Sequence, residues 1–308
     1  MSRFLYYTDP HLSVRCPVYR IDDYSTSLIA KLEEVYDIAE KNNADFVLCG
    51  GDFFNSHSIF SFGLINNIID VLNNSNLDTY SIIGQHDIFG YNSETFKSST
   101  LAFIERHCKS FYIIREPVDK DDLVIYPCHC YDDFNDSLDV SSPKKKYSIL
   151  VAHKLISKKK APFDVIVTSE IKKNGFNLIL SGDLHSGVPE HAVGKTTYYN
   201  PGSLVRRAIN EIGRKIKVGL IDVSFKKGIA IKEICLKNVG KAEDVFSMSA
   251  LENKSKENIN TDAFISGIED LENESVDIFD FIEKAAQKEK LNKNIIEYIM
   301  SKKDSVEV

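Results

Sequence analysis

Five stretches of the sequence carry residues that commonly bind metal ions, and each stretch directly follows a short apolar run. In chain order these residues are Asp9 and His11, then Asp52, then Gln85, His86 and Asp87, then His153, and finally Asp183 and His185. A lone histidine is more often a core or surface residue, but five such stretches indicate one shared polar site. Because imidazole and carboxylate groups together suit divalent metal ions, we expect a metal centre.

Asp52 occupies the central position in this pattern. The apolar run 46–49 predicts a buried strand, and Gly50 and Gly51 allow the backbone to turn where a larger residue would clash. Asp52 therefore comes just past the carboxyl end of a strand, where open α/β sheets bind their ligands. Since a carboxylate has two oxygens, Asp52 could bridge two cations.

The elements that must position these residues alternate between strand and helix at the start of the chain. We predict strands at 4–7, 46–49 and 80–83, separated by helices at 25–41 and 62–72 in which apolar residues recur every three or four positions. This alternation is typical of parallel strands in an α/β fold.

Shorter elements follow this first part. After a helix at 101–108, we predict strands at 111–114, 123–126, 147–152 and 176–180. Pro127 is expected to end the second of these strands, and residues 132–146 to form a loop. Further runs at 196–199, 216–223 and 229–236 predict a second sheet. The predicted fold class is therefore α/β, a two-sheet β-sandwich flanked by helices.

The charge distribution divides the chain into a neutral body and an acidic tail. The 308 residues include 38 Lys and Arg and 45 Asp and Glu, a net charge of −7. Residues 241–308 hold 9 of the basic and 16 of the acidic residues, which leaves 29 of each in residues 1–240. The acidity belongs to the tail, so net charge does not exclude nucleic-acid binding by the body.

The same change in composition predicts the domain organisation. We predict a core at 1–239, a polar linker at 240–260 and a small C-terminal helical module at 261–308. The module carries narrow apolar stripes, which favour either docking to a partner or packing back onto the core.

A cytoplasmic location is expected from the sequence. No apolar run approaches the roughly 20 residues of a membrane span, and the N-terminus lacks a signal-peptide cleavage site. The six cysteines are scattered, and the spacing of Cys128 and Cys130 does not match a C-x-x-C zinc or redox pair. We therefore expect reduced thiols and no membrane partner.

The order of these motifs resembles the calcineurin-like metallophosphoesterase superfamily over roughly residues 1–225. The matching motifs are Asp-x-His at Asp9, Gly-Gly-Asp at Asp52, Gly-x-His-Asp at His86, the lone His153 and Gly-x-x-His at His185. The resemblance implies a four-layer fold and the hydrolysis of phosphoesters by a water activated between two divalent ions.

The resemblance also implies which residues hold each ion. The first ion is expected at Asp9, His11, Asp52 and His185, and the second at Asp52, Gln85, His153 and Asp183. Gln85 and Asp183 stand where the family usually has Asn and His. Gln85 offers the same carbonyl oxygen as Asn, and Asp183 replaces an imidazole with a carboxylate, which favours Mn²⁺, with Mg²⁺ as the alternative. Both departures fall on the second ion and could leave it weakly held.

His86 and Asp87 are the catalytic residues that the resemblance implies. His86 is expected to face the substrate and to protonate the leaving oxygen. Asp87 is expected to orient the His86 ring.

The residues around Asp52 resemble one branch of the superfamily. The Ser/Thr phosphatase branch has an arginine soon after the bridging aspartate, and this sequence has none there. The segment is instead similar to the G-G-D-x-F motif of SbcD-type DNA-repair exonuclease subunits of bacteria and bacteriophages. Ser203, followed by Arg206 and Arg207, also resembles that branch, which implies contacts to DNA phosphates.

The branch implies a DNA exonuclease subunit that acts with an SMC-like coiled-coil ATPase in recombination, repair or replication. The ATPase is expected to bind the C-terminal helices, and helix 62–72 is a candidate surface for a homodimer. Two alternatives stay open: a nucleotide phosphodiesterase or protein phosphatase of the same fold, and a non-catalytic scaffold that has lost the second ion.

Overall fold

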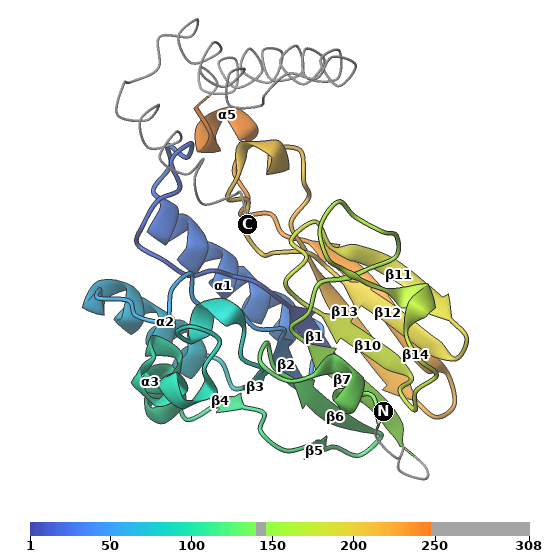
Figure 1. Ribbon diagram of the computed structural model, residues 1–308. Coiled ribbons are helices and arrows are strands. Elements are labelled where there is room, and N and C mark those ends of the chain that lie inside the picture. The colour runs from blue at the N-terminus through green and yellow to red at the C-terminus, as the bar shows by residue number, and fades with distance from the viewer. Residues whose placement is uncertain (140–145, 248–308) are drawn as a thin grey trace, which may run out of the picture. The chain divides into compact units, whose positions relative to one another are not determined.

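The structure is a computed structural model that describes residues 1–139 and 146–247. The predicted linker beyond residue 247 and the helical module predicted at 261–308 lie outside the described residues. Two six-stranded sheets and three principal helices make up the described part (Figure 1). The mixed α/β class with two sheets flanked by helices is thereby confirmed.

The first sheet has the strand order β14-β13-β1-β2-β3-β4. Its four parallel strands are β1 (Ser2–Tyr7), β2 (Phe46–Cys49), β3 (Asp78–Ser81) and β4 (Phe111–Ile113). Its two antiparallel strands are β13 (Lys217–Ser224) and β14 (Gly228–Cys235). The prediction that the runs 216–223 and 229–236 belong to a second sheet is therefore wrong, because β13 pairs with β1.

The second sheet has the order β11-β12-β10-β7-β6-β5. Its strands are β5 (Val118–Asp119), β6 (Leu123–Cys128), β7 (Tyr147–Ala152), β10 (Leu178–Ser181), β11 (Val188–Val193) and β12 (Thr196–Asn200). A separate pair is formed by β8 (Ile156–Ser157) and β9 (Ile166–Val167).

Pro127 lies within β6 and does not end it, which corrects the prediction. Strand β6 pairs with β7 along its whole length, whereas β5 covers only Val124 and Ile125 on the other side. Pro127 therefore lies on an unpaired edge, where a missing N–H group costs no ladder hydrogen bond. The predicted loop 132–146 also contains a short helix, α4 (Phe134–Ser137).

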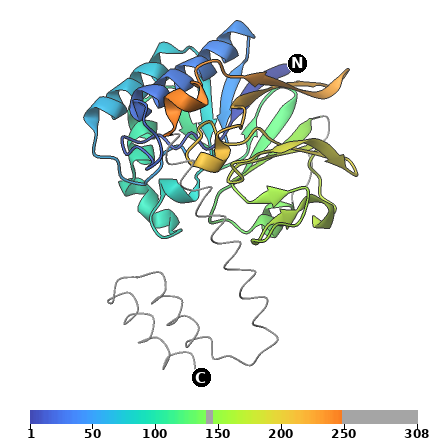
Figure 2. The same ribbon diagram turned by 90° about the horizontal axis from the view of Figure 1, so that it is seen from above.

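Three helices cover the outer face of the first sheet (Figure 2, blue to teal). They are α1 (Tyr24–Lys41), α2 (Phe62–Asn74) and α3 (Thr100–His107), as predicted to within two residues at either end. Each begins at a side chain that accepts a hydrogen bond from a backbone N–H in the first turn, namely Asp23, Ser61 and Ser99. Among the described helices, none is long and apolar enough to cross a membrane.

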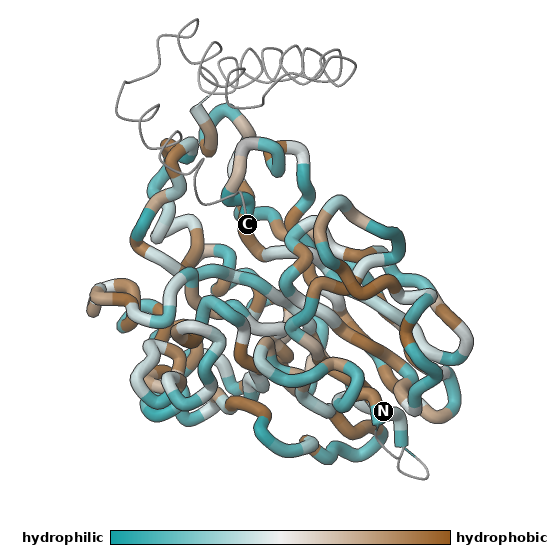
Figure 3. Tube along the Cα trace, viewed as in Figure 1, coloured by the Kyte–Doolittle hydropathy of each residue, from teal (hydrophilic) through white to brown (hydrophobic). Residues whose placement is uncertain are grey.

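Alternating side chains along each strand build separate apolar layers. On β1, Phe4 and Tyr6 lie in the core between the two sheets, while Leu5 and Tyr7 lie in the core beneath the helices. A third cluster, which includes Phe134, covers the outer face of the second sheet. Figure 3 shows the hydrophobic residues concentrated along the strands, so the loops at the strand ends are left for polar groups.

Residues 240–247 pack against the core. Ile21 donates a backbone hydrogen bond to Val245, within the short helix α5 (Ala242–Val245), and the buried ring of Phe246 lies 5.7 Å from the Arg20 guanidinium. The domain boundaries stay predictions, but any truncation of the chain must spare this segment.

Lys31 on α1 is a buried cation, with 1% of the residue exposed. Its Nζ donates a hydrogen bond to the Ser27 carbonyl at 3.0 Å, and no carboxylate in the described part of the chain forms an ion pair with it. Burial, with a smaller contribution from the Arg20 charge, lowers the pKa of Lys31 to about 8.

We expect Lys31→Met to raise the free energy of unfolding near pH 7, by at most about 3 kcal/mol, because it removes a buried charge. The folded-state pKa lies below the ordinary value, so between about pH 8 and 10.5 the unfolded chain binds more protons and wild-type stability rises with pH. The advantage of the variant should therefore shrink at higher pH. Urea unfolding of both proteins at about pH 7 and about pH 9.5 measures this difference in the free energy of unfolding.

Lys41→Met is the matched control, since Lys41 lies exposed on the same helix in an ion pair with Asp37. It should change stability by less than about 0.5 kcal/mol. A Lys31→Met protein that is less stable than the wild type near pH 7 would show that the buried ammonium is favourable.

Candidate metal centre

The predicted metal ligands meet where parallel strands of both sheets end. In the first sheet, β1 is followed by Asp9 and His11, β2 by Asp52, and β3 by Gln85. In the second sheet, β7 is followed by His153, and β10 by Asp183 and His185. The Asp183 N–H donates to Asp9 Oδ2 at 3.1 Å, and His153 Nδ1 lies 2.7 Å from the Gly50 carbonyl oxygen. The site therefore joins the two sheets directly.

The backbone at this site is held in an unusual conformation. Asp9, His11, Asp52 and Asp183 have φ angles of 52°, 45°, 49° and 67°, and they account for four of the six non-glycine residues with positive φ in the described chain. Each such residue costs on the order of 1 kcal/mol or more, and such residues cluster at functional sites. Hydrogen bonds from Asp9 N to Gly51 O and from His11 N to Asp52 O, both 3.1 Å, keep the two loops in place.

Close approach explains two of the glycines in the sequence motifs. A β-carbon at Gly84 would lie 2.1 Å from Asp52 Oδ1, and one at Gly182 would lie 2.6 Å from the Gly50 carbonyl oxygen. Any side chain at these positions would push the strand ends apart.

The four residues predicted to hold the first ion converge. His11 Nε2 lies 2.9 Å from His185 Nε2 and 3.8 Å from both Asp9 Oδ1 and Asp52 Oδ2. His185 Nε2 lies 3.7 Å from Asp9 Oδ1. Two imidazole nitrogens at such a distance need a shared proton or a shared cation, so this arrangement fits a metal ion.

The residues predicted for the second ion are only partly assembled. His153 Nε2 lies 3.5 Å from Asp52 Oδ2. Asp183 Oδ1 accepts a hydrogen bond of 2.7 Å from Gln85 Nε2. In the described chain, three groups of His, Cys, Asp and Glu residues have ligand atoms within 4.8 Å of one another, and none of them includes Asp183. Those groups combine Asp9, His11 and His185; His11, Asp52 and His86; and Asp9, Asp52 and His153.

Comparison with known proteins identifies the family. The family model of the calcineurin-like phosphoesterases matches residues 2–187, which is more than half of the chain. The chain belongs to this family. No match was found among curated protein sequences.

Solved structures of other proteins resemble this fold. A dimetal phosphatase from Danio rerio has 8% sequence identity and a TM-score of 0.50, over 76% of this chain and 98% of its own. The protein TT1561 of Thermus thermophilus has 12% identity and a TM-score of 0.46, over 75% and 98%. A phosphoesterase from E. coli has 13% identity and a TM-score of 0.39, over 76% and 100%. At 8% identity, the likeness to the Danio rerio structure shows a shared fold alone.

The electrostatics of this phosphoesterase site favour bound cations. Burial, together with the charges of Asp52 and Asp183, raises the pKa of Asp9 to about 7. Burial alone would lower the pKa of His153, but the neighbouring carboxylates outweigh it and raise that pKa to about 10. Within the described residues, the buried atoms Asp52 Oδ2, His153 Nε2 and His11 Nδ1 have no hydrogen-bond partner. Carboxylates and unpaired ring nitrogens crowded together in this way fit a divalent metal centre.

The Gly50 carbonyl orients the His153 ring as a metal ligand requires. A carbonyl oxygen only accepts hydrogen bonds, so Nδ1 carries the proton that is shared with Gly50, and Nε2 is left to face Asp52.

His86 lies on the open side of the site. Its side chain is 38% exposed, its backbone N–H donates to Asp52 Oδ1 at 2.8 Å, and its Nε2 lies 3.9 Å from Asp52 Oδ2. Its Nδ1 faces the carbonyl oxygen of Asn55 at 3.1 Å, which fixes the ring. A substrate that approaches from solvent can therefore reach Nε2.

Asp87 does not orient the His86 ring, which corrects the predicted role. Its carboxylate accepts hydrogen bonds from the backbone N–H groups of Gly84, Phe54 and Phe53, at 2.9, 3.0 and 3.3 Å. Burial and the charge of Asp52 nevertheless raise the pKa of Asp87 to about 7. Asp87 thus joins the loops after β2 and β3, and Asn55 orients the histidine.

Two of the three predicted phosphate-binding residues are buried structural groups. Ser203 Oγ donates to the carbonyl of Asp9 at 2.8 Å, and the Arg206 guanidinium donates to the carbonyls of Ile212 and Val239 at 2.7 and 2.6 Å. Direct phosphate contact is therefore a wrong prediction for Ser203 and Arg206. Arg207 lies beside His185 in a hollow of about 750 Å³, and its predicted role stays open.

Two residues that were not predicted from the sequence also support the site. Thr8 donates from Oγ1 to Asp9 Oδ2 at 2.6 Å, and Asn200 accepts from the Gly202 N–H at 2.7 Å while its Nδ2 donates to the Leu184 carbonyl. Thr8 directly precedes Asp9, and Asn200 directly precedes the turn at Pro201 and Gly202. These two positions are the sequence features that could have indicated a supporting role.

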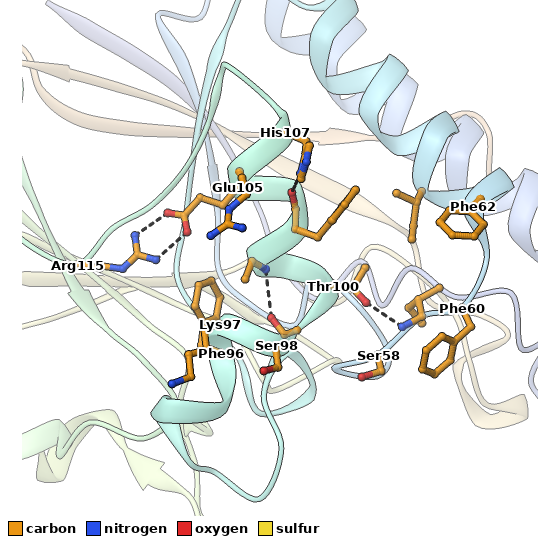
Figure 4. Close-up of a pocket in the computed structure, with 16 residues that line it drawn as sticks. Ser58, Phe60, Phe62, Phe96, Lys97, Ser98, Thr100, Glu105, His107 and Arg115 are labelled. Carbon is orange, nitrogen blue, oxygen red and sulfur yellow. Dashed lines mark hydrogen bonds and ion pairs between the residues drawn. The ribbon is translucent and has the colours of Figure 1, made fainter.

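A separate hollow of about 730 Å³ lies between α2 and α3 and contains none of the predicted site residues (Figure 4). Its lining includes Phe60 and Phe62, and an ion pair between Glu105 and Arg115 at 2.6 Å. This hollow has a mixed aromatic and charged lining and is separate from the metal centre.

We expect Mn²⁺ to raise the melting temperature of chelator-treated protein by roughly 5 to 10 °C when its concentration is about 100 times the Kd. Asp52→Asn should lose most of this shift, because Asp52 contributes to both predicted ion sites. Differential scanning fluorimetry measures the shift. Asp70→Asn, an exposed carboxylate on α2, is the control and should keep it. An unchanged shift in Asp52→Asn would place the bound Mn²⁺ elsewhere.

Proposed function

We propose that this phosphoesterase is a DNA exonuclease subunit of the SbcD-type branch, which hydrolyses phosphodiester bonds and works with an SMC-like coiled-coil ATPase in recombination, repair or replication in the cytoplasm. The observation that carries the hydrolytic part is the environment of Asp52 Oδ2. It lies 3.5–3.9 Å from the Nε2 atoms of His153, His11 and His86, and has no hydrogen-bond partner in the described chain.

Asp9, His11, Asp52 and His185 would hold one divalent ion, and Asp52, His153, Gln85 and Asp183 the other. Such ions supply charge neutralisation of the phosphate and lower the pKa of an attacking water. We propose Mn²⁺, with Mg²⁺ as the alternative, because Gln85 keeps the carbonyl oxygen of the usual Asn, and Asp183 adds a carboxylate where the family usually has His.

His86 supplies the proton of the reaction in this proposal. Its ring is fixed through Nδ1 at the Asn55 carbonyl, which leaves Nε2 free to donate to the leaving oxygen. Nε2 lies 3.9 Å from Asp52 Oδ2, which places the proton donor beside the predicted bridging carboxylate. General acid catalysis of this kind contributes typically about 10²- to 10⁴-fold.

The choice of DNA rests on the residues that surround the ligands. No arginine lies soon after Asp52. The G-G-D-x-F motif ends in Phe53 and Phe54, which are buried and contact each other ring to edge at 5.2 Å. Arg207 has no hydrogen bond from its guanidinium to other described residues and lines the hollow beside His185. It is the remaining candidate for a phosphate of the DNA backbone.

Two protein partners belong to the proposal. The ATPase would bind residues 261–308, which lie outside the described residues. A second copy of the chain would bind through α2, where Phe60 and Phe62 are 98% and 83% exposed beside the hollow of Figure 4.

We expect His86→Ala to lower the cleavage of labelled duplex DNA in Mn²⁺ by about 10²- to 10⁴-fold, because the leaving oxygen loses its proton donor. The Mn²⁺-dependent shift in melting temperature should persist. His107→Ala, an exposed histidine on α3, is the matched control and should cleave normally. Wild-type activity in His86→Ala would disprove the role of His86.

Different results of the same assay would favour the other functions. Hydrolysis of nucleotides or phosphoproteins without cleavage of DNA would indicate a phosphodiesterase or phosphatase. Fewer than two ions per chain and no hydrolysis of any phosphodiester would indicate a scaffold.

Truncation after Ser247 is expected to leave a folded core that binds Mn²⁺ but no longer binds the ATPase. A cut at Val239 would remove Gly240, whose carbonyl accepts a hydrogen bond from Arg206, and Phe246, which covers Arg20. Co-purification of the longer truncated chain with the ATPase measures binding. Retained binding would place the docking surface within residues 1–247.

A further inference from the structure

The turn that follows the metal-site residues Gln85 and His86 presents an aromatic side chain to solvent. In the turn from Phe89 to Asn92, the Asn92 N–H donates to the Phe89 carbonyl at 3.1 Å. The two central residues, Gly90 and Tyr91, have φ angles of 60° and 56°. Two successive positive φ angles are typical of type I′ turns, whose central positions favour Gly, Asn and Asp.

Tyr91 is an unexpected residue at such a position. A bulky side chain at positive φ is strained, and Tyr91 is 65% exposed, so packing compensates for little of that strain. The turn is held by Thr95, whose Oγ1 accepts from the Phe89 N–H at 3.0 Å and lies 2.6 Å from the Asn92 carbonyl oxygen, to which it donates. The turn therefore fixes the point at which the Tyr91 side chain leaves the backbone, and most of that side chain is left exposed.

The Tyr91 ring lies at the edge of the metal centre. Together with Gln85, His153, Asp183 and Lys154, it lines a hollow of about 200 Å³. Gln85, His153 and Asp183 are the residues predicted to hold the second ion, so a group that rests on Tyr91 would lie next to a phosphate bound at the ions.

A second exposed aromatic residue, Phe89, lies in the same turn. Phe89 is also 65% exposed, and its ring centroid lies 5.3 Å from that of His57. Phe60 and Phe62 line the hollow of Figure 4, and Phe225 follows β13 at the opposite end of the first sheet from the metal ligands. Phe163 and Tyr131, 53% and 36% exposed, are chain neighbours of residues that line the hollow of about 200 Å³, but only Tyr91 among these aromatic residues lines it.

We propose that Tyr91 stacks on a nucleobase of the nucleotide next to the scissile phosphate, so that the substrate is an unpaired DNA end. This inference rests on the proposed nuclease function. An exposed aromatic ring binds any base by its π-face, whereas the bases inside a duplex already stack on each other and offer no free face. A single-stranded or frayed end would therefore be preferred over a fully paired one.

The test compares two labelled oligodeoxynucleotides that differ only at their terminal nucleotides, which carry either bases or abasic residues. We expect the wild type in Mn²⁺ to cleave the base-bearing strand with a kcat/KM about 5- to 100-fold higher. In Tyr91→Gly this ratio should fall to about one, and in Tyr91→Phe it should persist. Phe225→Ala is the control and should keep the wild-type ratio.

The melting temperature separates stacking from a structural role. Tyr91→Gly should melt at or above the wild-type temperature, because glycine accepts the positive φ without strain. A wild-type ratio in Tyr91→Gly, or a wild type that does not distinguish the two strands, would overturn the proposal.

If no cleavage occurs, the affinities of the protein for the two strands test the stacking. Fluorescence anisotropy with Mn²⁺-loaded His86→Ala, alone and combined with Tyr91→Gly, compares affinities for the same two strands without cleavage. Tighter binding of the base-bearing strand that depends on Tyr91 supports stacking, and equal binding overturns it. Absent cleavage by the wild type would count against the nuclease function separately.

Discussion

The buried carboxylate of Asp52 is the constraint on which the rest of the site depends. Its Oδ1 accepts the backbone N–H of His86, but its Oδ2 lacks a hydrogen-bond partner in the described chain and is surrounded by three imidazoles. An uncompensated buried carboxylate costs several kcal/mol, so positive charge must be present around Oδ2. A protonated His153 supplies part of that charge, and bound divalent ions would supply more while displacing the proton.

Both sheets must end at this carboxylate, and the cost appears in the backbone. The loops after β1, β2 and β10 place Asp9, Asp52 and Asp183 at positive φ, while glycines at 84 and 182 allow neighbouring strand ends to touch. The two apolar layers on either side of the first sheet hold the strands rigidly enough to maintain this strain. The fold thus stabilises a site that is locally unfavourable without its ions.

Much of this arrangement could be predicted from the sequence, because polar residues that directly follow buried parallel strands have few other places to lie. That rule groups the candidate ligand residues, the apolar periodicity gives the helices, and the family resemblance assigns ligands to each ion. Sheet membership does not: hydrophobic periodicity marks β13 as a strand but does not reveal that it pairs with β1. The roles of Arg206 and Asp87 were also out of reach, because their partners are backbone groups that only the tertiary fold brings near. The strain at Tyr91 likewise appears only in the backbone angles.

Anomalous diffraction from a crystal soaked in Mn²⁺ would locate the bound ions. We expect two peaks that share Asp52, one among Asp9, His11 and His185 and the other beside His153 with Gln85 and Asp183. Absence of density at Asp52, or a single peak that excludes His153, would contradict a two-ion centre at the junction of the two sheets.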